Sequence, residues 1–134
     1  MDIFISWKRL TVRNSSDSRV LYANIDSISD EILYIGKADF CSVYERLNGR
    51  DKKNLYRHFE DIGIKKGRTI IGYIGKEEQK RLSQELLSDI ESLLIKRIKP
   101  TGNVQSLRNR ISRPGMRIFC EGHWPLEKAT FIDK

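Results

Sequence analysis

Apolar residues at steps of three and four mark the longest element of the chain. They recur between Glu77 and Lys99, at Leu82, Leu86, Leu87, Ile90, Leu93, Leu94 and Ile98. This spacing gathers them on one face and predicts an amphipathic helix over residues 77–99. Acidic residues at its start and basic residues at its end suit the helix dipole, and Pro100 ends it because proline has no backbone N–H to donate.

Runs of β-branched and aromatic residues predict three strands. Two of them, residues 19–25 and 31–36, flank the turn-forming stretch 26–30, and this arrangement is typical of a β-hairpin. A third run covers residues 69–74 and has a glycine close to each end. The strands predict an antiparallel sheet of three members.

Short helices are predicted between the second and third strands. Residues 42–47 form one, which Asn48-Gly49 stops, and a basic helical stretch follows over residues 52–61. Residues 1–18 are interpreted as a docking segment followed by a polar loop, and the apolar patches 117–120 and 130–132 receive no assignment. The order of elements favours a small α+β domain, a three-stranded antiparallel sheet flanked by helices.

Length and composition are typical of a single globular domain over residues 1–134. Apolar residues make up 39% of the chain and charged residues 32%, without a low-complexity block. No apolar run approaches the length of a membrane span and the first residues lack a signal-peptide pattern, so we expect a cytoplasmic protein with no membrane partner. Cys41 and Cys120 lack a metal-binding spacing, so we expect neither zinc nor a disulfide.

The positive charge of the chain is concentrated in one stretch. The net charge is +7, and the segment from Lys96 to Arg117 holds seven basic residues and no acidic residue. Lysine and arginine that neutralise phosphates release counterions, so a nucleic acid is the simplest partner for such a segment. A solvated basic tail that only aids solubility is the alternative.

Five short motifs occur in a fixed order along the chain. They are Val20-Leu21-Tyr22, Tyr34-Ile35-Gly36, Lys37-Ala38, Arg46, and a closing set of Glu91, Pro100 and Asn103. Together they resemble the GIY-YIG nuclease family over most of the chain. The resemblance implies a small nuclease fold with its core at about residues 19–103 and a basic extension over residues 104–134.

Three departures from the family pattern affect the site. Val20 stands where the family has glycine, and the gap between Tyr34 and Arg46 is longer than usual, so a loop over residues 39–41 must take up the extra length. Many members also place a histidine or tyrosine one helical turn after the arginine, where this chain has Arg50. Arg50, Tyr56 and His58 all remain candidates for that role.

The chemistry of phosphodiester hydrolysis explains why residues of these types would be present in the site. Glu91 is a hard oxygen ligand for Mg²⁺ or Mn²⁺, and the Arg46 guanidinium suits the scissile phosphate. The resemblance implies that Tyr22 is the general base, with Tyr34 beside it and Lys37 lowering its pKa. Asn103 is expected to fix the geometry of the site through hydrogen bonds.

These observations favour a metal-dependent endonuclease that cleaves DNA in restriction, phage defence or repair. A nucleic-acid-binding module without catalysis is one alternative, and an RNase or nuclease toxin on the same fold is another, because the reacting phosphate is common to DNA and RNA. Substrate recognition is expected from the added segments, from a homodimer that makes paired cuts, or from another subunit. The predicted nucleic-acid contacts are Arg50, His58, Arg108, Arg110, Arg113 and Arg117.

Overall fold

The structure, a computed structural model, describes residues 1–103 and 115–133 and has an α+β fold. In this part of the chain the strands are β1 (Asp2–Arg9), β2 (Val20–Asp26), β3 (Ile32–Ala38), β4 (Gly67–Ile74), β5 (Arg117–Gly122) and β6 (Thr130–Ile132). The helices are α1 (Val43–Leu47), α2 (Lys52–Asp61), α3 (Lys76–Gln79) and α4 (Gln84–Ile98), and a short 3₁₀ turn, η1, covers Asn14–Ser16. None of these helices has the length and apolar character needed to cross a bilayer.

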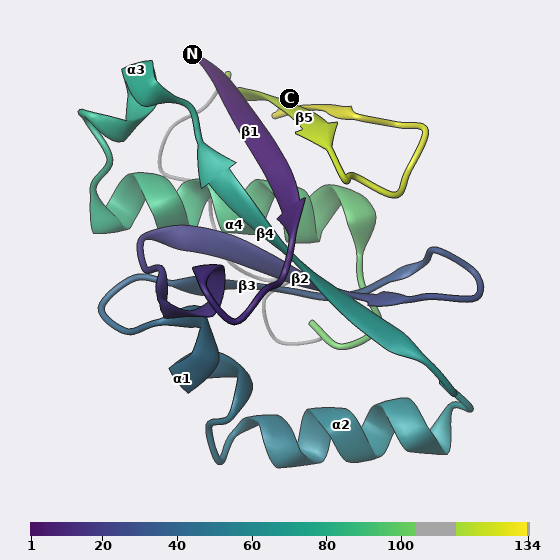
Figure 1. Ribbon diagram of the computed structural model, residues 1–134. Helices are drawn as coiled ribbons and strands as arrows, with labels where there is room; N and C mark the ends of the chain where they lie inside the picture. Colours follow the sequence, from purple (N-terminus) through teal and green to yellow (C-terminus); the bar gives the residue numbers. More distant parts are fainter. Residues whose placement is uncertain (104–114, 134) are drawn as a thin grey trace.

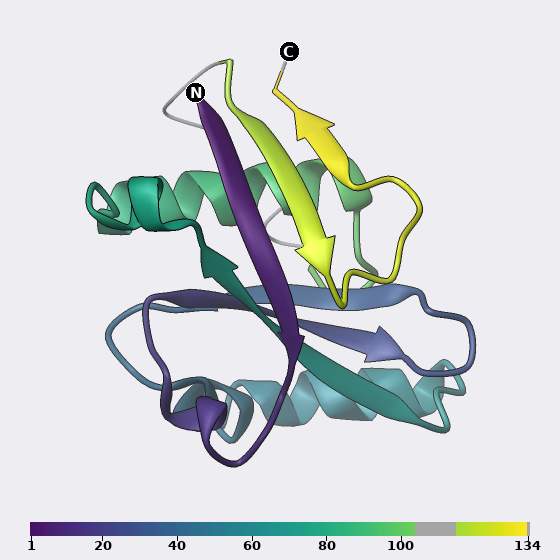
Figure 2. The same cartoon turned by 45° about the horizontal axis from the view of Figure 1, so that its top comes forward.

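The six described strands form one mixed sheet in the order β3-β2-β4-β1-β5-β6. All neighbours are antiparallel except β1 and β5, which run parallel. The sheet curls strongly into a half-barrel, so that β1 and β5 cross β2 and β3 at a steep angle (Figures 1 and 2). Helix α4 lies against one face, whereas α1 and α2 lie beyond the opposite face of β2 and β3 (Figure 1).

Two separate cores result from this arrangement. The larger one packs α4 against the inward side chains of the strands, with Ile90 and Leu94 meeting residues such as Ile5 and Ile35. The smaller one lies on the α1 face and includes Tyr22 and Val43. Strand β2 is buried along its whole apolar length because both of its faces are covered.

Local predictions from the sequence are largely confirmed. The hairpin is β2 and β3, the third predicted strand is β4, and the two short helices are α1 and α2. The predicted helix over residues 77–99 is wrong at its start, because the chain forms the short helix α3 and then a break before α4. The Ser83 side chain accepts a hydrogen bond from the Leu86 N–H at 3.0 Å and so begins α4 with an N-cap.

The prediction of a three-stranded sheet is wrong. The residues interpreted as a docking segment form β1, where Ile3, Ile5 and Trp7 alternate with outward-facing residues and are fully buried. The unassigned apolar patches near the C-terminus form β5 and β6. The pairing of β5 with β1 brings residues near the two ends of the chain together, and such a long-range parallel contact leaves no local pattern in the sequence.

The close approach of β1 and β5 generates a stability prediction with a matched control. Gly122 and Gly63 have similar positive φ values, 81° and 85°. A Cβ on Gly122 would lie 2.4 Å from the Trp7 carbonyl oxygen, whereas a Cβ on Gly63 would meet nothing within 4 Å. Gly63→Ala should therefore cost about 1 kcal/mol of unfolding free energy for the left-handed backbone alone.

Gly122→Ala should cost about 1–3 kcal/mol more than Gly63→Ala, because the backbone of β1 must move as well. Chemical denaturation of the two variants and the wild type measures the difference. Equal losses for the two variants would contradict the described pairing of β5 with β1.

Candidate active site

Five of the six predicted catalytic residues converge around the hairpin of β2 and β3. Tyr22 comes from β2, Tyr34 and Lys37 from β3, Arg46 from α1 and Glu91 from α4. Their proximity is evident in their mutual electrostatic effects, since Lys37 and Arg46 both act on Glu91, and Arg46 and Tyr34 both act on Tyr22. Segments far apart in the sequence thus supply one site at the edge of the sheet.

Tyr22 and Tyr34 lie together on the α1 face of the hairpin. Tyr22 is paired with Gly36 and Tyr34 with Asn24, so the two rings are diagonal neighbours with centroids 6.1 Å apart. The Tyr22 ring lies across Gly36, where an added Cβ would come within 2.5 Å of both Cζ and the hydroxyl oxygen. The glycine of the Tyr-Ile-Gly triplet is therefore what leaves room for the Tyr22 phenol.

Arg46 is held by a well-capped helix of only one turn. The Ser42 side chain accepts a hydrogen bond from the Glu45 N–H at 3.1 Å, and the Glu45 carboxylate accepts one from the Ser42 N–H at 3.2 Å. This capping box fixes α1, which brings Arg46 to the tyrosines.

Buried polar atoms without hydrogen-bond partners gather on this face. Among the described residues, the Tyr22 hydroxyl, the Arg46 Nε and the Asn24 Nδ2 form no well-aligned hydrogen bond, although Tyr34 and Arg46 approach the Tyr22 hydroxyl closely enough to act on its pKa. Asn24 lies two residues along β2 from Tyr22 and faces the same side of the sheet. Such groups are costly in a folded protein, and several together at one place indicate a site where water or a ligand supplies the missing contacts.

Burial controls the pKa of Tyr22. Burial raises the pKa of the Tyr22 phenol well above its ordinary value, and Tyr34 raises it further, whereas Arg46 lowers it. Tyr22 is therefore a neutral phenol at physiological pH in the free protein. The cation next to it is Arg46, and Lys37 instead lies with Ser88 and Glu91 on α4.

Glu91 is a partly buried carboxylate among three cations. Burial raises its pKa, and Lys37, Arg46 and Lys52 counteract the rise only in part. The Lys37 ammonium donates a hydrogen bond to Ser88, which lies one helical turn before Glu91 on α4. Lys37, Arg46 and Lys52 are the described cations that act on the Glu91 carboxylate.

Asn103 closes the free edge of β3. Its side-chain oxygen accepts a hydrogen bond from the Ile35 N–H and its amide group donates one to the Ile35 carbonyl, both at 2.8 Å. The Gly102 N–H also donates to the Leu33 carbonyl at 2.8 Å. Asn103 thus contacts the backbone of the Tyr-Ile-Gly triplet and positions it, at a distance from the reacting groups.

Lys52 is a site residue that the sequence analysis missed. It is almost fully buried, and its ammonium lies 5.1 Å from the centre of the Tyr34 ring and 3.2 Å from the Asp51 carboxylate. Its position along α2 could have revealed this burial. Lys52 precedes Leu55, Tyr56 and Phe59 by three, four and seven residues, a spacing that places it on the same face of the helix as these apolar side chains. The neighbouring Lys53 is exposed, although a count of charges treats the two alike.

The surroundings of Arg50, Tyr56 and His58 distinguish these three candidates for the histidine or tyrosine that many family members place one helical turn after the arginine. Tyr56 lies near Tyr34, and its hydroxyl donates a hydrogen bond to the Leu47 carbonyl at 2.6 Å. His58 instead lies 3.3 Å from the Thr101 hydroxyl, behind the end of α4, and the Arg50 side chain is exposed. Tyr56 is the candidate that the structure brings to the site.

The predicted nucleic-acid contacts in the basic segment have different outcomes. Arg108, Arg110 and Arg113 lie outside the described residues. Arg117 is on β5, where its guanidinium forms two hydrogen bonds to the Asp2 carboxylate at 2.8 and 2.9 Å. Three strands separate β5 from the edge strand β3, so Arg117 does not face the candidate site.

A divalent cation at this site would have one protein ligand. Within the described residues, no three His, Cys, Asp or Glu side chains converge as a metal-binding group. Glu91 nevertheless fits such an ion, because its partly buried carboxylate is a hard oxygen donor. Mg²⁺ commonly binds through one or two carboxylates, with water and substrate phosphate as its other ligands.

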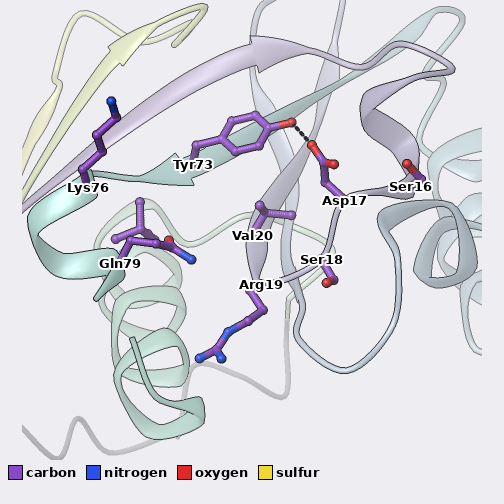
Figure 3. A pocket seen from close by; sticks show the side chains of 9 residues that line it. Ser16, Asp17, Ser18, Arg19, Val20, Tyr73, Lys76 and Gln79 are labelled. Carbon is purple, nitrogen blue, oxygen red and sulfur yellow. Dashed lines mark hydrogen bonds between the residues drawn. The ribbon is translucent and has the colours of Figure 1, made fainter. Parts of the chain in front are cut away.

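A second hollow lies apart from this site. A pocket of about 560 Å³ opens where β2 begins and β4 ends, with Arg19 and Lys76 among its lining residues (Figure 3). Within it the Tyr73 hydroxyl donates a hydrogen bond to the Asp17 carboxylate at 2.5 Å. None of the six predicted catalytic residues lines this pocket, so we do not assign the chemistry to it.

Comparisons with known proteins place no constraint on the function. No protein-family model, curated protein or solved structure matches the chain. A functional assignment therefore depends on the side chains of the site and on their chemistry.

The raised pKa of Glu91 generates a prediction for stability against pH. A raised pKa in the folded state means that folding favours the protonated carboxyl, so the wild type loses stability as the pH rises from the ordinary value of 4.5 through the folded pKa. Glu91→Gln removes this loss. In EDTA, the variant should gain stability relative to the wild type over that interval and keep a constant advantage above it.

Chemical denaturation from about pH 4 to about pH 8 measures this difference. Glu77→Gln is the matched control, because Glu77 is an exposed carboxyl on α3 and should show no such trend. A Glu91→Gln variant that becomes less stable than the wild type as the pH rises would contradict the described environment of Glu91.

Proposed function

We propose that the protein is a metal-dependent endonuclease of the GIY-YIG type that hydrolyses phosphodiester bonds in DNA. The observation that carries the proposal is the meeting of two buried groups, the Tyr22 hydroxyl and the Arg46 Nε, next to the Glu91 carboxylate. Neither group forms a well-aligned hydrogen bond within the described part of the chain, although Tyr34 and Arg46 lie close enough to the Tyr22 hydroxyl to shift its pKa, and a phosphate with its attacking water would supply aligned partners.

The charge of the site supports an anionic substrate. Lys37, Arg46 and Lys52 all act on Glu91, and the nearby Asp51 carboxylate is exposed. The cations therefore exceed the carboxylates at the site, which favours a bound phosphate. Arg46 would bind the phosphoryl oxygens through its guanidinium, and Lys52 would neutralise further charge from beneath Tyr34.

Tyr22 would lie beside this phosphate and act on the attacking water. Tyr22 is held in place by its contact with Gly36 and is neutral in the free protein, so it orients the attacking water by hydrogen bonding. Arg46 lowers the pKa of Tyr22, which favours loss of the phenol proton and so the phenolate form that could accept a proton from the attacking water. Asn103 acts through the backbone of Ile35 by holding β3 in place.

Glu91 would hold the divalent ion. A bound Mg²⁺ or Mn²⁺ supplies a water of lowered pKa and neutralises charge on the phosphoryl oxygen. Lys37, which donates to Ser88 one turn before Glu91, keeps the carboxylate region positively charged and limits the rise of the Glu91 pKa. Each described side chain of the site thus has a role in binding, orienting or proton transfer.

Glu91→Gln and Arg46→Ala should each reduce cleavage by about a thousandfold or more, because they remove the ion ligand and the phosphate clamp. Purified protein is incubated with supercoiled plasmid, linear duplex, branched DNA and RNA, with Mg²⁺ or with EDTA, and products are read on a gel. Glu77→Gln, at an exposed carboxyl of α3, should keep wild-type rates.

The same assay separates the proposal from its rivals. Wild-type rates in the Glu91→Gln variant would remove Glu91 from the mechanism. Cleavage of RNA alone would favour an RNase, and tight DNA binding without cleavage under any metal condition would favour a binding module.

Tyr22→Phe tests the phenol separately from the fold. Since the Tyr22 hydroxyl is buried and forms no well-aligned hydrogen bond among the described residues, its removal should leave the free energy of unfolding within about 1 kcal/mol of the wild type or raise it. Cleavage should nevertheless fall by about a hundredfold or more. Denaturation and plasmid cleavage are measured on the same preparation, and a large loss of stability would mean that the hydroxyl has a structural partner.

A further inference from the structure

Phe40 is a large apolar side chain left in water beside the candidate site. Its side chain is 84% exposed, and it lies in the link over residues 39–42 that joins β3 to α1. The protein has one hydrophobic core on each face of the sheet, and the Phe40 ring belongs to neither core. An exposed aromatic residue at the border of a functional site is typical of a contact surface.

The backbone on both sides of Phe40 is held in place. Before it, the Arg19 N–H donates to the Ala38 carbonyl at 2.5 Å, and the Arg19 guanidinium lies 4.0 Å from the Asp39 carboxylate. After it, the Val43 N–H donates to the Asp17 carbonyl at 3.0 Å and the capping box fixes the start of α1. The ring therefore projects from a short link between two anchored points, which lowers the entropy cost of using it in binding.

The link over residues 39–42 also places Phe40 near Arg46, the residue proposed to bind the phosphate. The next residue, Cys41, is near enough to Arg46 to raise the pKa of its guanidinium, together with Tyr22 and Asp51, against the lowering effect of burial. Phe40 therefore lies on the same short stretch of chain as Arg46, six residues before it. The exposed Tyr44 on α1 adds a second aromatic side chain to the same border.

We propose that Phe40 stacks on an unpaired base next to the scissile phosphate, so that the preferred substrate is DNA with a single-stranded, forked or otherwise unstacked base at the cut. This inference rests on the proposed function. A base has an aromatic face that matches the ring, and Arg46, Lys37 and Lys52, which all act on Glu91 in the candidate site, match the charge of its phosphate. An apolar protein partner would gain nothing from that charge.

The test uses the full chain in EDTA, which allows binding without cleavage. Fluorescence anisotropy measures affinity for three oligonucleotides of one sequence, namely a duplex, a fork and a single strand, each with 2-aminopurine at successive positions near the junction. Phe40→Ala should weaken binding of the fork and the single strand by about 5- to 100-fold and binding of the duplex by less than about twofold. It should also abolish the quenching of one 2-aminopurine, whereas Phe40→Trp should retain both affinity and quenching.

Ile28→Ala is the matched control, because Ile28 is an apolar side chain of 73% exposure in the turn at the other end of the same hairpin. It should change neither affinity nor quenching. Equal weakening of all three oligonucleotides by Phe40→Ala would overturn the inference, and so would no weakening at all. A wild-type dimer in sedimentation that Phe40→Ala dissociates would overturn it as well, in favour of a second copy on this surface.

Failure of the inference and failure of the proposed function give different results. Loss of the Phe40 effect with intact plasmid cleavage removes only the stacking role. Absence of cleavage by the wild type, with Phe40-dependent quenching preserved, removes the proposed chemistry and leaves a base-binding surface.

Discussion

The pairing of Asn103 with the backbone of Ile35 is the interaction on which the candidate site depends. An edge strand presents free N–H and C=O groups, and here a side-chain carboxamide satisfies one donor and one acceptor as a neighbouring strand would. Lys99 ends α4 in a left-handed conformation, and Pro100 lets the chain turn back along β3. The same contact therefore fixes the end of α4 relative to the hairpin and sets Glu91 opposite Lys37.

This geometry places function and stability in conflict at one point. Tyr22 and Arg46 each bury a polar atom that finds no partner within residues 1–103 and 115–133, and Glu91 is partly buried with a raised pKa. A domain selected only for stability would fill these positions with apolar side chains. Gly36 shows the same conflict. A glycine inside a strand lowers stability because it has no side chain to pack, but here it leaves room for the Tyr22 ring.

The sequence predicts what local periodicity controls. The hairpin and the apolar face of α4 follow from steps of two and of three to four residues, and the motif order places Tyr22, Tyr34, Arg46 and Glu91 on the elements that bring them together. The parallel pairing of β1 with β5 was not predictable, because its partners are more than a hundred residues apart and each strand alone resembles a short apolar patch. Lys52 was missed because its charge was counted without its helical phase.

Charge along the chain and charge in space are different quantities in this protein. The seven basic residues from Lys96 to Arg117 carry the whole net charge, yet Arg117 is paired with Asp2 on β5. The three described cations that act on Glu91 come instead from β3, α1 and α2, which lie outside the basic run from Lys96 to Arg117. An anion site requires cations that converge from several elements around a partly buried centre, because only there does the low dielectric strengthen their combined field. Among the described residues, the convergence of cations in the fold therefore marks an anion site that charge along the chain does not reveal.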